Sequence, residues 1–327
     1  MRIALDLTPL VGRFPTSIER VARGARDALL ASREVEIVEL APSDPKDLTR
    51  SGLRRWRQRT LPWLAEEAGA DLLHTFCSAF PLRSRVPVVQ TVHELPWKHG
   101  VDENAGIVHR AWAWLGKRRA RAQCVPSEGV ARDLAGPNVH VVPWGVSREF
   151  LGEVSVEQLR ERIPELPEPP FVLAPGGGRA KKRIDLASDA ARDAGTPMVI
   201  TGSTERDDPD DVHLGHVDED LMPALYEAAA ATFVLADSEG FGLPVLESLA
   251  RGTGVIVPKG TVQAATAGGL AYEVDPADEL ADAVRAVLFA RGDDEDEEID
   301  AERRRFAAQH TWERTAARLV EVWRSVL

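Results

Sequence analysis

The sequence of 327 residues predicts an α/β protein of two domains, each with a parallel β-sheet covered by helices on both faces. Three observations support this prediction. Short apolar runs alternate with Ala-, Leu- and Arg-rich helical segments throughout the chain, a pattern typical of parallel sheets. The chain is too long for one ordinary hydrophobic core. Finally, a Pro-rich stretch at 164–170 separates two series of such elements.

In the first series, each apolar run of strand length is followed by a segment with the composition of a helix. We expect strands at 3–7, 35–40, 72–74, 86–92, 123–125 and 139–142, and helices at 18–31, 53–69, 104–121 and 128–135. Strands that alternate with helices in this way predict β-α-β units and therefore parallel pairing.

The second series repeats the pattern. We expect strands at 171–174, 198–201, 212–215, 232–235, 254–257 and 271–274, and helices at 184–194, 220–230, 244–251 and 278–291. A final helix is expected at 312–327, because Ala316, Leu319, Val320 and Trp323 follow the i, i+3, i+4, i+7 spacing of one helical face.

Composition excludes several classes of protein. A net charge of −12 argues against a general nucleic-acid binder. The chain has no apolar run of transmembrane length, and Asp6 and Pro9 interrupt any signal-peptide core. Cys77 and Cys124 are too few for a disulfide framework and suit the cytoplasm. No Cys/His spacing predicts a metal site, and we expect the acidic run 293–298 to be a solvated loop.

The most informative segment is Glu-Gly-Phe-Gly-Leu-Pro-Val-Leu-Glu at 239–247, in which two carboxylates bracket a Gly-rich turn. An apolar strand precedes it, and Pro244 stands where a helix would begin. The N–H groups of such a loop and helix start favour an anion, typically phosphate. Because Glu239 and Glu247 can also accept hydrogen bonds from hydroxyls, the segment predicts a sugar-nucleotide site.

A second segment, Pro-Gly-Gly-Gly-Arg-Ala-Lys-Lys at 175–182, also lies between a predicted strand and helix. Its spacing matches neither the dinucleotide-binding nor the P-loop pattern. Glycines let the backbone approach a ligand, and clustered cations suit a diphosphate. Cations at a helix start oppose the helix dipole unless an anion compensates them. The alternative is a solvated basic helix start.

Segment 239–247 resembles the E-x7-E motif of the retaining, nucleotide-sugar-dependent glycosyltransferases of family 4, which have the GT-B architecture. The flanking pattern from Gly-His-Val-Asp at 215 to Ala-Arg-Gly-Thr at 253 is also similar to that family. The resemblance implies two Rossmann-like domains that face a cleft, an acceptor-side domain at 1–165, a donor domain at 166–308, and a helix at 309–327 that crosses back to the first domain. It further implies a cytoplasmic enzyme that needs no metal or cofactor. A GDP-, UDP- or ADP-sugar would serve as donor, and a glycan, lipid-linked or small molecule as acceptor.

The resemblance also assigns roles to residues at matching positions. His93, in Thr-Val-His-Glu-Leu, and Glu239 would contact the donor sugar, and Lys182 would stabilise the leaving diphosphate. Glu247 would bind the ribose. The remaining donor-binding residues would be Gly12, Gly178, Arg179, Lys181, Gly240, Phe241, Gly242 and Leu243, with Gly202, His216 and Val217 on the nucleobase side. Simple packing is the alternative for His93, and also for Trp144, which replaces the family's usual Asn.

Two positions depart from the family pattern. Ser17 stands where Gly is usual, and Ala265 stands where Glu is common. These departures keep open a catalytically weak sugar-nucleotide-binding or scaffold protein of the same fold. A sugar-nucleotide epimerase of this fold is a further alternative, against which the motif context argues.

Two basic segments carry tryptophans, Trp56 within 53–59 and Trp112 with Trp114 within 109–121. Cationic helices with interfacial aromatic residues can hold a protein on anionic lipid. This predicts peripheral contact with the inner face of the membrane. The alternative is surface arginines with tryptophans in the core.

Overall fold

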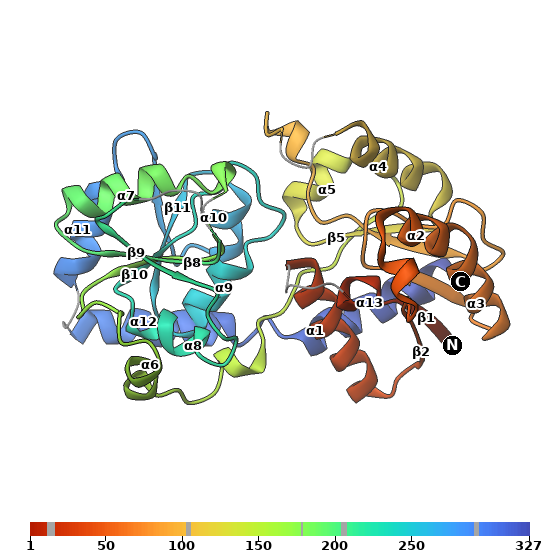
Figure 1. Cartoon of the computed structure of the whole chain (residues 1–327), viewed down its shortest axis with the longest axis horizontal. Helices are drawn as coiled ribbons and strands as arrows, with labels where there is room; N and C mark the ends of the chain where they lie inside the picture. The colour runs from red at the N-terminus through yellow and green to blue at the C-terminus, as the bar shows by residue number, and fades with distance from the viewer. Residues whose placement is uncertain (12–16, 103–105, 178, 204–207, 291–293) are drawn as a thin grey trace. The chain divides into compact units, whose positions relative to one another are not determined.

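The computed structural model describes residues 1–11, 17–102, 106–177, 179–203, 208–290 and 294–327. The chain forms two compact units (Figure 1). The first unit contains Met1–Gly145 together with Trp312–Leu327, and the second contains Val146–Thr311. The segment 146–165, which we expected in the first domain, therefore belongs to the second unit. Among the described residues, no helix is long and apolar enough to cross a bilayer.

The sheet of the first unit has six parallel strands in the order β2-β1-β3-β4-β5-β6. The strands are β1 (Arg2–Asp6), β2 (Glu36–Leu40), β3 (Leu72–Thr75), β4 (Val88–Thr91), β5 (Ala122–Val125) and β6 (Val139–Val141). The helical segments are η1 (Thr8–Val11), α1 (Ser17–Ser32), η2 (Pro45–Leu48), α2 (Arg50–Arg55), η3 (Trp56–Thr60), α3 (Leu61–Glu67), η4 (Pro96–Lys98), α4 (Ile107–Arg119), α5 (Glu128–Leu134) and α13 (Trp312–Val326).

The C-terminal helix α13 is part of the first unit and packs against α1. Gly24 permits this close contact, because an added Cβ would lie 2.3 Å from the Trp312 ring. The fully buried Trp323 donates from Nε1 to His74 Nδ1 at 3.1 Å. Thr315 donates to the carbonyl oxygen of Pro143 at 2.8 Å. Helix α13 is thus an integral part of the same unit as residues 1–145.

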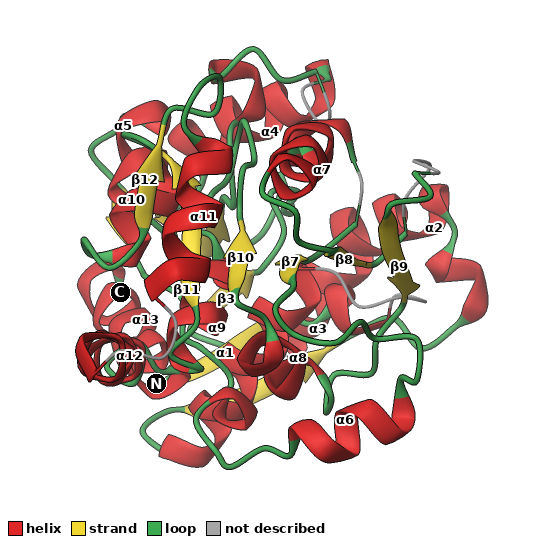
Figure 2. Ribbon diagram, turned by 90° about the vertical axis from the view of Figure 1, so that its left-hand side faces the viewer, coloured by secondary structure: helices red, strands yellow, loops and turns green. Residues whose placement is uncertain are grey.

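The sheet of the second unit also has six parallel strands, which run in the order β12-β11-β10-β7-β8-β9 across Figure 2. The strands are β7 (Val172–Ala174), β8 (Met198–Thr201), β9 (Asp211–Gly215), β10 (Ala231–Phe233), β11 (Gly254–Pro258) and β12 (Tyr272–Val274). The helical segments are η5 (Arg148–Phe150), α6 (Val156–Arg162), η6 (Ala180–Lys182), α7 (Ile184–Asp193), α8 (Met222–Ala228), α9 (Leu243–Ala250), α10 (Val262–Ala267), α11 (Leu280–Ala290) and α12 (Asp294–Ala307).

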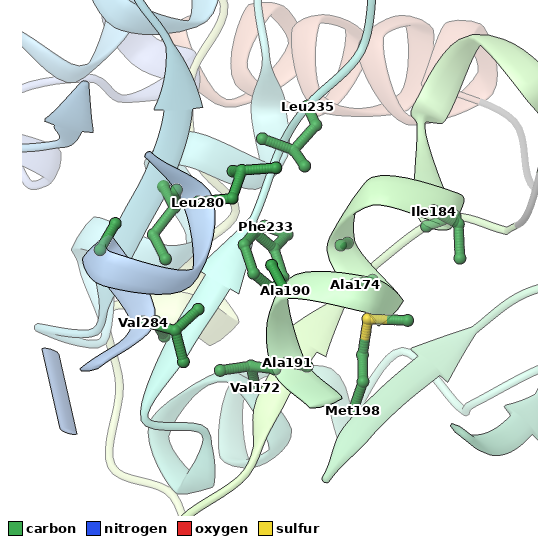
Figure 3. Close-up of a cluster of buried hydrophobic side chains, with 14 of the residues drawn as sticks. Val172, Ala174, Ile184, Ala190, Ala191, Met198, Phe233, Leu235, Leu280 and Val284 are labelled. Atoms are coloured by element: carbon green, nitrogen blue, oxygen red, sulfur yellow. The ribbon is translucent and has the colours of Figure 1, made fainter. Parts of the chain in front are cut away.

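Helices α7 and α11 cover one face of this second sheet. Side chains of both helices meet those of the central strands in one apolar cluster, which includes Phe233, Val172, Val284 and Met198 (Figure 3). Burial of this kind stabilises by roughly 25 cal/mol for each Å² of apolar surface removed from water. The cluster therefore holds the strands whose carboxyl ends carry the predicted motifs.

The predicted fold class, two parallel α/β sheets, is confirmed, and each predicted strand is present within about two residues of its predicted ends. Two local predictions were wrong, and two helices were missed. The segment 53–69 is divided by the π-helical turn η3, and α6 and α10 were not predicted. Residues 294–298 of the acidic run lie in helix α12, where we expected a solvated loop.

Each sheet has one point at which successive connections change direction. In the first unit this point lies between β1 and β3, and in the second between β7 and β10. In open α/β sheets, ligands bind beyond the carboxyl ends of the strands at such a switch point. The loops after β7 and β10 are the two predicted motifs, so the fold brings together segments that are about sixty residues apart in sequence.

Candidate functional site

The glycines after β7 allow two loops to approach one another. Gly177 donates from its N–H to the Thr201 carbonyl oxygen at 2.6 Å, and a Cβ at Gly177 would lie 2.6 Å from the Ser203 carbonyl oxygen. Gly202, with φ of 88°, faces the backbone of Gly177 in return. These two glycines therefore allow the loops after β7 and β8 to lie in contact.

Lys181 and Lys182 lie in the short turn η6, before α7 begins at Ile184. The Lys182 Nζ lies 3.1 Å from the Glu239 Oε2, and only 14% and 17% of the two side chains are exposed. Lys181 is buried, and its carbonyl oxygen accepts a hydrogen bond from the N–H of Asp237 at 2.9 Å. The sequence predicted an anion to compensate these cations, and Glu239 supplies part of that compensation from within the protein.

The environment of Glu239 favours the charged carboxylate. Burial alone would raise its pKa, but Lys182, Lys181 and Arg179 together hold the pKa below its ordinary value. At neutral pH, Glu239 is therefore ionised beside three cations.

The loop after β10 turns into α9 at Gly242, which has φ of 94°. Two side chains of α10 hold this loop: Thr266 Oγ1 donates to the Phe241 carbonyl oxygen at 2.6 Å, and Gln263 Nε2 donates to that of Ala236 at 2.7 Å. In a trans peptide the N–H points away from the C=O. Thr266 therefore directs the N–H of Gly242 to the opposite side, at the start of α9, where unsatisfied N–H groups favour an anion.

Glu247 lies in the buried face of α9. It is 2% exposed, and Tyr226 donates its hydroxyl proton to Oε2 at 2.8 Å. In the next position, Ser248 donates to Thr232 Oγ1 at 2.9 Å. The hydrogen bond from Tyr226 orients the carboxylate of Glu247, the predicted ribose-binding residue. The hydrogen bond from Ser248 fixes α9 to β10.

The predicted nucleobase-side residues follow neighbouring strands. Gly202 comes directly after β8, and His216 and Val217 come directly after β9. Val217 is buried and His216 is exposed. All three therefore lie at the same edge of the sheet as the two motifs.

His93 follows β4 in the first unit and is 8% exposed. Its Nε2 lies 2.6 Å from the carbonyl oxygen of Phe76, so Nε2 carries the proton. Burial lowers the pKa of His93 to about 4, although the bond to Phe76 acts in the opposite direction. The ring is therefore neutral at physiological pH. Its Nδ1 has no hydrogen-bond partner among the described residues and can accept from a hydroxyl.

Trp144 packs against His93, with 5.2 Å between the ring centroids, and is buried. The packing alternative for this tryptophan is therefore correct. Trp56 is also buried, and Trp112 is half-buried against Phe80. These two cannot serve as interfacial anchors, which corrects that part of the membrane prediction. Only Trp114, 53% exposed, remains available.

Sequence reasoning missed Tyr226, Gln263 and Thr266, whose roles depend on contacts between separate helices. Ala265 is exposed, so the polar contacts of α10 with the motif loop come from its neighbours instead. Ser17 is exposed at the start of α1. The predicted ligands Gly12 and Gly178 lie outside the described residues. Among the described residues, no three His, Cys, Asp or Glu side chains gather as metal ligands.

Two family models match successive parts of the chain. The model for Glycosyltransferase Family 4 matches residues 18–150, and a second, described as Glycosyl transferase-like, matches residues 182–321. The two ranges cover most of each unit and do not overlap.

Curated relatives match over part of their length. The chain is 30% identical to the D-inositol 3-phosphate glycosyltransferase of Corynebacterium urealyticum over 173 residues, 51% of this chain and 38% of that protein. It is 35% identical to the O-antigen chain mannosyltransferase B of Escherichia coli over 115 residues, 34% of this chain and 29% of that protein. The chain thus matches well under half of these relatives.

Solved structures of the same fold match over nearly the whole chain. Sucrose-phosphate synthase from Thermosynechococcus elongatus superposes with a TM-score of 0.76 at 18% identity, covering 99% of this chain and 98% of that one. HepE from Anabaena, in complex with UDP and glucose, superposes with a TM-score of 0.71 at 15% identity, covering 99% and 100%. These likenesses identify the fold as GT-B.

Proposed function

We propose that the chain is a glycosyltransferase of the family 4 type, which transfers a hexose from a nucleotide sugar to an acceptor hydroxyl, with retention and without a metal. The observation that carries this proposal is the Lys182–Glu239 pair at the switch point of the second sheet, beside the start of α9. It joins a diphosphate-binding cation to a carboxylate able to orient sugar hydroxyls.

In the proposed reaction, the bond between the anomeric carbon and the diphosphate oxygen breaks. The acceptor oxygen forms a new bond to that carbon on the same face, and its proton passes to the departing diphosphate. Negative charge develops on the leaving group. Lys181, Lys182 and the N–H groups at the start of α9 would stabilise it without reorganisation. His93, through Nδ1, and Glu239 would accept hydrogen bonds from the sugar hydroxyls.

The relatives suggest candidate substrates. HepE was solved with UDP and glucose, which makes a UDP-sugar the first donor to test. The names of the curated relatives suggest two acceptor classes, a phosphorylated polyol and a growing glycan chain. A panel of UDP-, GDP- and ADP-sugars is therefore tested by thermal stabilisation. The true donor at 100 times its dissociation constant adds about 2.7 kcal/mol.

Turnover decides between the proposal and its main alternative, a binding protein of the same fold, which Ser17 and Ala265 motivate. A glycosyltransferase releases nucleoside diphosphate only when sugar is transferred or hydrolysed, and NMR of the product shows whether the anomeric configuration is retained. Binding without release would favour the binding protein. Conversion of the donor into an isomer would favour an epimerase.

We also propose that α4 contacts an anionic membrane surface. Ile107 is 83% exposed and Trp114 is 53% exposed, and they lie on one helical face with Arg118, whose guanidinium is 3.8 Å from the Trp114 ring centroid. The sequence from 104 to 127 contains five Lys or Arg and no acidic residue. Flotation with anionic vesicles that is abolished by salt and by Trp114→Ala supports this contact. Flotation unaffected by both contradicts it.

A further inference from the structure

Arg57 occupies an unusual backbone position in the first unit. It lies in η3, a π-helical turn between α2 and α3. π-Turns are rare, and many of them are found at functional sites. Trp56 in the same turn is buried in the core, while the side chain of Arg57 is 18% exposed. The turn thus fixes one residue in the core and directs the next toward the carboxyl ends of the strands.

The partner of Arg57 is Asp6, the last residue of β1. Asp6 is 0% exposed, and Thr8 donates to its Oδ1 from both the backbone N–H, at 3.0 Å, and the hydroxyl. The other oxygen, Oδ2, lies 3.7 Å from Arg57 Nε. Neither of these two atoms has a hydrogen-bond partner among the described residues. The two opposite charges are therefore near one another, but Oδ2 and Nε form no hydrogen bond with each other.

The far side of the Arg57 guanidinium contacts Cys77, which follows β3. Its Nη2 lies 3.3 Å from Cys77 Sγ. Burial raises the pKa of this thiol to about 12, so the sulfur is a neutral, weak acceptor. Cys77 therefore positions the guanidinium without neutralising it.

These contacts are located at the switch point of the first sheet, between the ends of β1 and β3. Ligands of α/β sheets bind at such points. Burial also raises the pKa of Asp6, against the opposing effects of Arg57 and Thr8, so the carboxylate there is energetically unfavourable. A structural role alone would be served better by an apolar residue. The burial of the Asp6 carboxylate beside the partly exposed Arg57 therefore favours a functional role for the pair.

We propose that Arg57, positioned by Asp6, binds an anionic group of the acceptor, a phosphate or a carboxylate. A guanidinium presents a planar set of donors that matches such groups. The surrounding segment 50–60 contains five arginines and no acid, so the local charge attracts anions. This inference rests on the proposed function, because it identifies a group of the acceptor and not of the donor.

The test measures binding of inorganic phosphate and of inositol monophosphate by calorimetry, with unphosphorylated inositol as the matched ligand. Four variants are compared with the wild type: Arg57→Ala, Arg57→Lys, Asp6→Asn and Arg59→Ala. Arg59 is an exposed arginine of the same turn, so its removal controls for charge alone. The lysines of the second unit are unchanged in every variant, and differences between the variants therefore report the first unit.

Arg57→Ala should weaken binding of both phosphate ligands by about tenfold or more, as expected for loss of a charge-assisted contact. Arg57→Lys should restore part of the affinity, and Arg59→Ala should change it little. Asp6→Asn should weaken phosphate binding without lowering the melting temperature, which a purely structural role would not produce. Affinity for nucleoside diphosphate should remain unchanged in all four variants.

The proposal is overturned if the wild type binds neither phosphate ligand at millimolar concentration, or if Arg57→Ala binds them as well as the wild type. Equal losses in Arg59→Ala, or a parallel loss of nucleoside diphosphate affinity, would also overturn it. Failure of the proposed function has a different signature. In that case no nucleotide sugar is turned over, whereas the Arg57-dependent difference in phosphate binding persists.

Discussion

Lys182 donates a hydrogen bond to Glu239 with 3.1 Å between Nζ and Oε2, and thereby joins the loops after β7 and β10. The two residues are 57 positions apart, and each belongs to a different predicted motif. The lysine is therefore both a candidate ligand of the diphosphate and the counter-ion of a candidate sugar ligand. In the proposed function, the donor diphosphate would be a second anion at a cluster that already holds the Glu239 carboxylate.

Replacing both Lys181 and Lys182 with alanine should weaken nucleoside diphosphate binding by tens to thousands of fold, because charge-assisted contacts contribute about 1.5–3 kcal/mol each. Affinity for a free nucleoside should fall much less. The pairing with Glu239 also predicts a stability loss of about 1–3 kcal/mol in the unliganded protein, since a mostly buried carboxylate loses its partner. Calorimetry and denaturant unfolding measure these effects.

Lys259→Ala is the matched control for the lysine variants, because Lys259 pairs with Glu279 on the surface. It should affect neither nucleotide affinity nor stability appreciably. Equal losses for nucleoside and nucleoside diphosphate in the double variant would show that the lysines act through the fold of the loop.

Glu239→Gln and His93→Ala should lower turnover far more than they lower affinity for the nucleoside diphosphate. Both side chains are predicted to contact the donor sugar, which that ligand lacks. The neutral His93 ring offers Nδ1 as an acceptor, so His93→Asn should retain part of the activity if the amide oxygen reaches the same hydroxyl. Steady-state kinetics measures the turnover, and calorimetry measures the affinity for the nucleoside diphosphate. An equal fall in turnover and affinity would show that the assignment is wrong.

Glu247→Ala should weaken nucleoside diphosphate binding by roughly 1–3 kcal/mol, the cost of leaving hydrogen-bond donors unpaired. Tyr226→Phe removes the hydroxyl that aligns the Glu247 carboxylate while leaving the acid in place. Its effect on affinity should be smaller and in the same direction. Affinity that is unchanged in Glu247→Ala would exclude the ribose role.

Thr266→Val should slow turnover without removing any group that contacts the donor. The hydroxyl of Thr266 fixes the Phe241 carbonyl and hence the opposite N–H of Gly242. Loss of this bond leaves the carbonyl unpaired and the N–H less well directed, at a cost of about 1–3 kcal/mol. Because the effect should require an anion at the start of α9, affinity for the free nucleoside should remain constant. A comparable loss for nucleoside would indicate a general disturbance of the loop.

Asp6→Asn should raise the melting temperature at neutral pH. The pKa of Asp6 is raised by burial above its ordinary 3.8, so its stabilising protonated form is complete below pH 3.8 and is lost as pH rises through the folded value. Arg57 and the Cys77 thiol, whose pKa burial raises to about 12, are the charged and titratable groups that face the carboxylate. The difference between variant and wild type should therefore vanish below pH 3.8 in thermal scans. Each kcal/mol corresponds to about 2–4 °C for a domain of this size.

The sequence allowed the sheets to be predicted because buried parallel strands are short continuous apolar runs, as at 198–201 and 254–257. The two motifs could be located because each follows such a run. Their pairing through Lys182 and Glu239 could not be predicted, since it depends on β10 lying beside β7 and not beside β9. The role of Arg57 was also hidden. In sequence it is one of five neighbouring arginines, and only the π-turn directs it inward.

The division of the first unit between the two ends of the chain has a consequence for its biogenesis. Ribosomes release a chain from its N-terminus, so the 166 residues from Val146 to Thr311 emerge before Trp323 can reach His74. The second unit, which is continuous, can close during translation. The first unit cannot complete its fold until α13 has been synthesised, and an apolar surface of α1 stays exposed until then. Chaperones bind exposed apolar surface of this kind. Removing the last sixteen residues should therefore impair the part of the protein that was synthesised first.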